Sequence, residues 1–125
     1  MSQLREVYKC DTCGNIVEIV HGGKGELVCC GAPMKQLKEN TVDAAIEKHV
    51  PVLSLNGTTA TVKVGSVAHP MDPDHYIEFI ELMTAARVYR AELSPGKAPE
   101  ASFDIHGNVT GARAYCNKHG LWKNQ

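Results

Sequence analysis

The chain has 125 residues, of which 43% are hydrophobic, and its 13 basic and 14 acidic side chains give a formal net charge of −1. A chain of this length has room for one ordinary domain, or for one domain and a metal-stapled appendage, and its apolar content excludes a largely disordered protein. The nearly balanced charge argues against a general nucleic-acid binder.

The N-terminal residues contain no apolar run typical of a signal peptide, and no segment is long and apolar enough to span a membrane. Five cysteines without a secretion signal favour reduced, metal-binding thiolates over a framework of disulfides. We therefore expect a cytoplasmic protein that is not attached to a membrane.

Residues 1–37 are expected to form a small domain organised by a metal. They hold four of the five cysteines and five of the 11 glycines, but few large apolar side chains. Such a segment buries too little apolar surface to offset the entropy lost on folding, so a metal is expected to form its core. After residue 37 the cysteines stop and strand-like alternation begins, which predicts a second domain over residues 38–125.

The early cysteines form two pairs separated by fifteen residues: Cys10, Cys13, Cys29 and Cys30. Gly14 and Gly31 follow the pairs and suit tight loops that direct backbone amides at sulfur. Zinc is the usual metal of a cysteine quartet. The adjacent pair is expected to distort the tetrahedron, which iron tolerates, so the spacing leaves zinc and iron open.

Residues 38–125 are predicted to be all β. Strands are expected over residues 50–55, 60–64, 77–82, 87–93, 101–106 and 109–116, the last being the final strand. The dipeptide Asn56-Gly57 predicts a hairpin, and residues 94–97 predict a turn. About seven short strands with regular turns favour an immunoglobulin-like β-sandwich. A helix over residues 43–48 is a competing interpretation of that segment.

Four of the six histidines are predicted to lie at strand ends or in loops: His49, His69, His75 and His119. Loops at one end of a sandwich converge, so these side chains and Cys116 are expected to meet around one metal ion. The strongest pair is Cys116 and His119, because two ligands three positions apart in a turn reach one ion. His21 and His106 lack such neighbours and are expected to be surface or structural residues.

Both groups of residues resemble parts of one protein family. The cysteine quartet is similar to desulforedoxin. Four further motifs resemble the superoxide reductase centre: Glu47-Lys48-His49, His69-Pro70, His75 and Cys116-x-x-His119. Together, in this order and over the whole chain, they resemble desulfoferrodoxin, the two-iron superoxide reductase. The resemblance implies a desulforedoxin-like domain followed by a catalytic sandwich.

The resemblance also implies two iron ions. The quartet would hold a distorted rubredoxin-type iron. The second iron would have four histidines in a plane (His49, His69, His75 and His119), Cys116 as the axial ligand and an open sixth position. The implied reaction is the one-electron reduction of superoxide to hydrogen peroxide without release of dioxygen, a protection against oxidative stress. A donor such as rubredoxin and a homodimer are the implied partners.

Two residues beside His49 are candidates for a catalytic role. Lys48 is expected to attract superoxide and to organise a water that delivers a proton. The resemblance implies that Glu47 occupies the open position of the oxidised iron after the product has left. Without the resemblance, a Glu-Lys pair on a loop would be interpreted as ordinary solvated surface.

Three other functions compete with this interpretation. A pure electron carrier would relay electrons through both irons, but it favours closed coordination. A structural zinc protein would be colourless, whereas iron–thiolate centres absorb visible light. A superoxide dismutase would also oxidise superoxide, so dioxygen release measured against peroxide formation separates it from a reductase.

Overall fold

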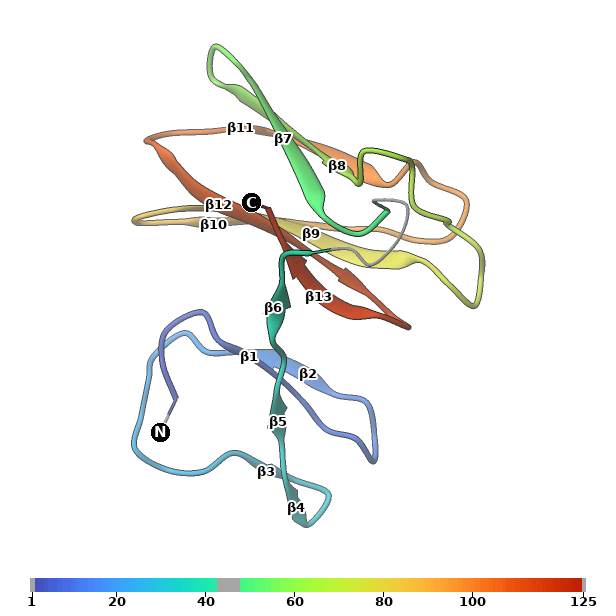
Figure 1. The fold of residues 1–125 in the computed structure, drawn as a ribbon. Coiled ribbons are helices and arrows are strands. Elements are labelled where there is room, and N and C mark those ends of the chain that lie inside the picture. Colours follow the sequence, from blue (N-terminus) through green and yellow to red (C-terminus); the bar gives the residue numbers. More distant parts are fainter. Residues whose placement is uncertain (1, 43–47, 125) are drawn as a thin grey trace. The chain divides into compact units, whose positions relative to one another are not determined.

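The structure, a computed structural model, describes residues 2–42 and 48–124 (Figure 1). Within these ranges the chain forms strands and turns without any helix, so the prediction of a mainly β protein is confirmed. It follows that none of the described residues belongs to a helix able to cross a membrane. The chain divides into two compact units, Met1–Lys38 and Glu39–Gln125.

The first unit is built from five very short strands. They are β1 (Val7–Lys9), β2 (Ile16–Glu18), β3 (Val28–Cys29), β4 (Ala32–Pro33) and β5 (Lys35–Gln36). One antiparallel sheet has the order β2-β1-β5, and β3 pairs with β4. The buried hydrophobic side chains described in this unit are Val7, Cys10 and Ile19. An apolar core this small gives little stability by itself, as the sequence indicated.

In the part of the second unit that the structure describes there are eight strands, of which seven pair antiparallel with a neighbour. They are β6 (Glu39–Asn40), β7 (Pro51–Asn56), β8 (Thr59–Val64), β9 (Ile77–Thr84), β10 (Val88–Glu92), β11 (Glu100–Asp104), β12 (Val109–Cys116) and β13 (Gly120–Lys123). One sheet has the order β11-β8-β7 and the other β10-β9-β12-β13-β6. The short β6 runs parallel to β13 at the edge of the larger sheet.

This strand order is immunoglobulin-like, as predicted. If β7 to β13 are taken in chain order as strands A to G, then A, B and E form one sheet while C, F and G lie in the other. The fourth strand, β10, pairs with β9 and so joins the larger sheet. Figure 1 shows the two sheets of this unit as layers facing each other.

The core of the second unit lies between its two sheets. Alternate residues of β8, such as Val62 and Val64, face alternate residues of β9 and β12, such as Leu82 and Ala114, and all four have no exposed surface. Cys116 continues the inward series of β12 and is also fully buried. The thiol is therefore fixed by the core packing, at the end of a strand and next to a loop.

A β-bulge lies at the beginning of β9, beside Cys116. Tyr115 pairs with Phe79, whereas Cys116 pairs with Ile77, so Glu78 is an extra residue in β9. The bulge explains why residues 77–82 alternate imperfectly in hydrophobicity. Bulges bend a strand and change the direction of its side chains, and they are common next to functional sites.

A network of ion pairs around a buried carboxylate joins four strands of the larger sheet. Glu81 is fully buried in β9 and accepts hydrogen bonds from Arg113 at 2.6 Å and from Arg90 at 2.8 Å. Arg113 also donates to Glu39 of β6 at 3.1 Å. Two arginines compensate the buried carboxylate, which alone would be strongly destabilising.

Several predicted boundaries are wrong. The strand expected to be last is followed by β13, and the strand expected over residues 101–106 ends at Asp104, so His106 lies beyond it. The hairpin after β7 has Gly57 and Thr58 as its loop residues, because Asn56 still pairs with Thr59; Gly57 has a φ of 62°. Residues 43–47 of the alternative helix lie outside the described residues.

Candidate metal centres

The four early cysteines meet in the first unit. Their sulfur atoms all lie within 4.8 Å of one another. The Sγ atoms of Cys13 and Cys29 are 3.5 Å apart, and those of Cys29 and Cys30 are 4.0 Å apart. A metal–sulfur bond of about 2.3 Å gives sulfur–sulfur edges of about 3.8 Å in a regular tetrahedron. The quartet therefore fits one tetrahedral ion, with unequal edges.

The backbone around the quartet adopts left-handed conformations that the adjacent pair requires. Gly14 and Gly31 have φ angles of 83° and 75°, as their positions after the cysteines predicted. Cys30 also has a positive φ, of 54°, which is uncommon for a residue with a side chain. This conformation brings the sulfur atoms of two neighbouring residues toward one point.

The thiols of the quartet differ in pKa. Hydrogen bonds from backbone amides, led by that of Cys13, lower the pKa of Cys10 to about 6. Hydrogen bonding to the other thiols, first to Cys13, raises the pKa of Cys30 to about 12 and also raises that of Cys29. Four thiols this close need a cation before all of them ionise, so their chemistry fits a metal site.

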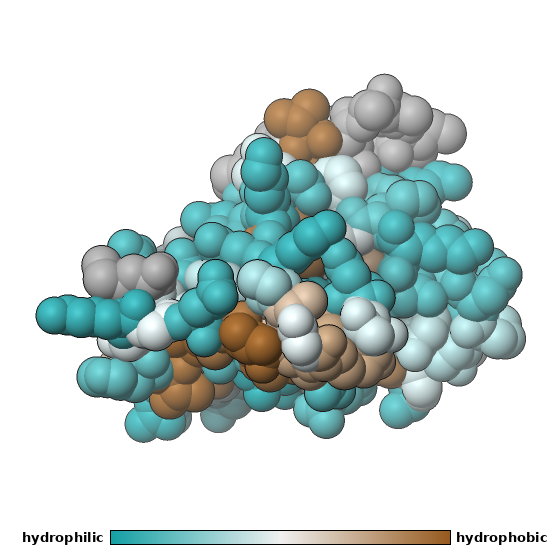
Figure 2. Space-filling view, turned by 90° about the horizontal axis from the view of Figure 1, so that it is seen from below, coloured by the Kyte–Doolittle hydropathy of each residue, from teal (hydrophilic) through white to brown (hydrophobic). Residues whose placement is uncertain are grey.

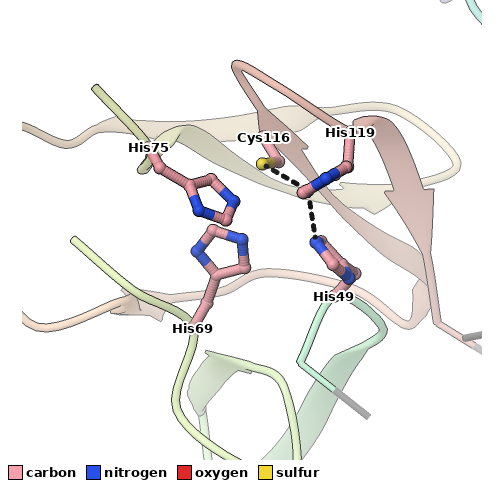
Figure 3. A group of neighbouring side chains, drawn as sticks. All are labelled: His49, His69, His75, Cys116 and His119. Carbon is pink, nitrogen blue, oxygen red and sulfur yellow. Dashed lines mark hydrogen bonds between the residues drawn. The ribbon is translucent and has the colours of Figure 1, made fainter. Parts of the chain in front are cut away.

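The second group of predicted ligands meets at one end of the sandwich. The donor atoms of His49, His69, His75, His119 and Cys116 all lie within 4.8 Å of one another. Figure 3 shows that these side chains come from separate segments and that the four imidazoles surround a common centre. All five residues that the sequence indicated are therefore brought together.

The four imidazoles form a closed ring. Neighbouring ring centroids are 4.9 Å apart for His49 and His69, 4.8 Å for His69 and His75, and 4.9 Å for His75 and His119. The pair of His119 and His49 closes the ring at 4.9 Å. Neighbouring rings meet edge to face, at interplanar angles between 69° and 81°. Four similar sides are what a planar set of four nitrogen ligands requires.

The nitrogen atoms are placed for a metal. His49 Nε2 and His119 Nδ1 are 3.1 Å apart, close to the edge of about 3.0 Å that metal–nitrogen bonds of about 2.1 Å give in a square. His69 Nε2 and His75 Nε2 are buried without any hydrogen-bond partner. Two orphaned buried nitrogens are costly unless an ion binds them, so the donor set fits a metal.

Burial controls the protonation of this group. Desolvation lowers the pKa of His69 to about 4, although its hydrogen bond to the Pro70 carbonyl opposes the shift. Desolvation, followed by the charge of His119, lowers the pKa of His75. Both imidazoles are therefore neutral at pH 7, the form that binds a metal. Burial also raises the pKa of Cys116, against hydrogen bonds from the backbone amides of Lys118 and His119.

Local hydrogen bonds hold the loops that carry the candidate ligands. His69 Nδ1 lies 2.7 Å from the Pro70 carbonyl oxygen, which leaves Nε2 to face the centre. His75 exchanges two backbone hydrogen bonds with Asp72, at 3.0 and 3.1 Å. Cys116 and Gly120 close a three-residue hairpin loop that carries His119, and Gly120 has a φ of 89°.

Two contributors were missed by the sequence analysis. Asn117 accepts a hydrogen bond from the Tyr76 amide at 2.9 Å and donates one to the Asp74 carbonyl at 3.0 Å. It thereby ties the Cys116–His119 loop to the loop that carries His75. Trp122 stacks on His49 and hydrogen-bonds to the His119 carbonyl. No local sequence pattern reveals these contacts, although Asn117 lies between two candidate ligands, Cys116 and His119.

The other predicted residues are placed differently. Lys48 is half-buried and directly precedes His49, whereas Glu47 lies outside the described residues. His21 and His106 are exposed and belong to neither group, as expected of surface residues.

Comparison with known proteins assigns both units to one family. Residues 2–37 match the desulfoferrodoxin N-terminal domain, and residues 41–125 match desulfoferrodoxin. A desulfoferrodoxin from Syntrophotalea carbinolica is 57% identical over 125 residues, covering 100% of this chain and 99% of its own.

Solved structures agree with this assignment. The superoxide reductase from Treponema pallidum superposes with a TM-score of 0.82 at 32% identity, covering 96% of this chain and 97% of its own. A one-iron superoxide reductase from Giardia intestinalis has a TM-score of 0.55 at 36% identity, covering 62% of this chain and 95% of its own. The chain belongs to the desulfoferrodoxin family.

Proposed function

We propose that this chain is a superoxide reductase with two iron centres. The observation that carries the proposal is the closed ring of four imidazoles beside a fully buried thiol. We assign Cys10, Cys13, Cys29 and Cys30 to a first iron in the domain of residues 1–37. We assign His49, His69, His75, Cys116 and His119 to a second, catalytic iron in the domain of residues 38–125.

Five donor atoms in the second group leave one coordination position for a substrate, which separates a catalytic site from a pure electron carrier. These five residues would hold a ferrous iron, which would give one electron to superoxide and become ferric, while two protons complete hydrogen peroxide. The side chains determine the approach. Cys116 and His69 are buried, whereas His119 is exposed, so the buried thiolate is shielded and substrate approaches from the solvent side.

The buried thiolate has a second role. Cys116 has no exposed surface, so its negative charge is little screened by water and is directed at the bound metal. A thiolate ligand increases electron density at iron, which favours donation of an electron. Neutral His69 and His75 add no negative charge, so the site keeps its attraction for an anion.

The decisive experiment measures products with an electron donor present. A reductase forms one hydrogen peroxide per superoxide consumed and releases no dioxygen. A dismutase releases about one dioxygen for every two superoxide ions by the stoichiometry of that reaction. Dioxygen release at that ratio, with the donor present, would contradict the proposal.

Lys48 is the candidate for attracting superoxide. We expect Lys48→Ile to slow the second-order reaction with superoxide by about tenfold and to weaken its salt dependence, because a local positive charge is lost. Pulse-generated superoxide with optical detection measures both. Lys63→Ile, on an exposed position of β8, makes the same change in net charge as a control. Equal rates and salt slopes for the two variants would exclude a local role for Lys48.

Glu47 is proposed to bind the oxidised iron after product release, although the structure does not describe it. We expect Glu47→Ala to keep peroxide formation while the visible spectrum of the oxidised second centre and its binding of azide change. A wild-type spectrum together with wild-type azide affinity would show that Glu47 is not a ligand.

The first domain is proposed to support electron supply and assembly. A rubredoxin is the proposed donor, and the cytoplasm the proposed location, since the described cysteines are all free thiols. A homodimer is proposed because Leu4, Val20 and Val28 of this small unit are 59%, 84% and 58% exposed. Figure 2 shows hydrophobic residues interrupting a mostly hydrophilic face of the chain. Light scattering that gives the mass of one chain would contradict the dimer.

A further inference from the structure

Trp122, the only tryptophan of the chain, contacts two of the proposed ligands. Its ring stacks on the imidazole of His49, with centroids 4.7 Å apart and an interplanar angle of 21°. Its indole N–H donates a hydrogen bond of 3.0 Å to the backbone carbonyl of His119. One side chain thus touches the two ligands whose nitrogen atoms are 3.1 Å apart.

The fold places Trp122 where the two sheets meet. In β13 it is paired with Ala114, a core residue of the larger sheet, so both lie on the inner face of that sheet. His49 precedes β7 of the smaller sheet by two positions. The stacked pair therefore connects the two sheets at the end of the sandwich that holds the site.

Stacking on Trp122 gives the His49 imidazole a fixed orientation, as other contacts do for three of the other proposed ligands. Cys116 is fixed by core packing, and His69 is buried and bonded to the Pro70 carbonyl. His75 is held by its backbone pair with Asp72. His49 is half-buried and lies before the first residue of its strand. A flat ring against one face of its imidazole limits rotation and keeps Nε2 directed at the centre.

We propose that Trp122 is a positioning residue of the catalytic metal centre, which holds the His49 imidazole by stacking and the His119 loop by its N–H bond. The inference rests on the ligand set proposed above. A metal-bound imidazole carries partial positive charge, and an indole face attracts positive charge. The contact therefore stabilises the loaded site as well as aligning it.

Iron release tests the proposal without depending on turnover. We expect Trp122→Leu to release ferrous iron from the second centre to a chelator about tenfold faster, a usual size for losing a residue that supports a ligand. Trp122→Phe keeps a stacking ring but loses the N–H bond to His119, so its release rate is expected to lie above that of the wild type by no more than about threefold. The electron paramagnetic resonance line shape of the oxidised second centre should change in Trp122→Leu, because the orientation of His49 is no longer fixed.

Tyr89→Leu is the matched control. Tyr89 is half-buried in the same sandwich and packs on Phe103 at 6.1 Å, and its hydroxyl accepts a hydrogen bond from the His106 amide. Its loss removes a similar aromatic contact away from the ligands, so iron release and line shape should stay as in the wild type. Equal behaviour of Trp122→Leu and Tyr89→Leu would overturn the proposal. Equally fast release from the Phe and Leu variants would overturn stacking as its cause.

A measurement on the wild type covers the case in which Trp122→Leu does not fold. Trp122 is the only tryptophan of the chain, so all of its tryptophan fluorescence comes from this residue. With the first centre already filled by zinc, zinc binding at the second centre should change the emission intensity, since the ion binds the imidazole in contact with the indole. Unchanged emission would overturn the proposal. A wild type that binds no second metal would instead refute the ligand set.

Discussion

Cys116→Ser is expected to lower the rate of superoxide reduction by at least about 100-fold, beyond the range for losing a mere support of a ligand. A serine hydroxyl is a hard, protonated group at neutral pH and does not replace a thiolate as an electron-donating ligand. Cys116 is fully buried, so the serine that replaces it is also enclosed. No other side chain can take its place as a ligand there. The visible band of the second centre should disappear while the band of the first centre remains.

The control for this prediction is Ala112→Ser. Ala112 lies on the same inward face of β12 and is also fully buried, so its replacement places a hydroxyl in the same core. A buried hydroxyl costs about 1–3 kcal/mol in either variant if it finds no partner. Iron content, visible spectra and the rate of superoxide decay should be normal in the control. A wild-type rate and spectrum in Cys116→Ser would show that the thiolate is not a ligand.

The candidate metal centres could be predicted from the sequence because few types of side chain bind such metals. Cysteine and histidine are among the few side chains that bind soft or borderline metals, and most of those present lie at strand ends or turns. Gly14 and Gly31 indicated left-handed turns that the backbone then adopts. The candidate groups needed only convergence of loops at one end of a sandwich, which the fold class already implied.

The rest depends on contacts between distant segments. The alternation of its strand predicts that Glu81 is a solvent-exposed polar residue. It is buried instead, because Arg90 and Arg113 are paired with it in the two neighbouring strands. The stack of Trp122 on His49 joins two different sheets. Strand β13 has four residues, too few for a clear period, and follows directly after a ligand loop. Register and inter-sheet packing decide these features, and a local pattern does not contain them.

The first unit provides the second large effect, through Cys13→Ser. The described unit buries little apolar surface, so its stability rests on the metal. Cys13 is exposed, and the replacement therefore removes a ligand without opening a cavity. We expect loss of the first iron, loss of its visible band, and cleavage of this unit by protease at least about tenfold faster, because local unfolding becomes accessible. Thr12→Ser, at the neighbouring exposed position, should leave all three unchanged.

The same variant separates the two roles of the first iron. The second centre draws its proposed ligands entirely from the second unit, so superoxide reduction with a small chemical reductant should keep the wild-type rate. The superoxide reductase from Giardia intestinalis, which matches 62% of this chain, is a one-iron protein. If Cys13→Ser is slower than the wild type with rubredoxin but not with the chemical reductant, the first iron relays electrons. If the variant and the wild type have equal rates with each donor, the first iron is structural. A chemical-reductant rate that falls with the first iron would contradict the independence of the two centres.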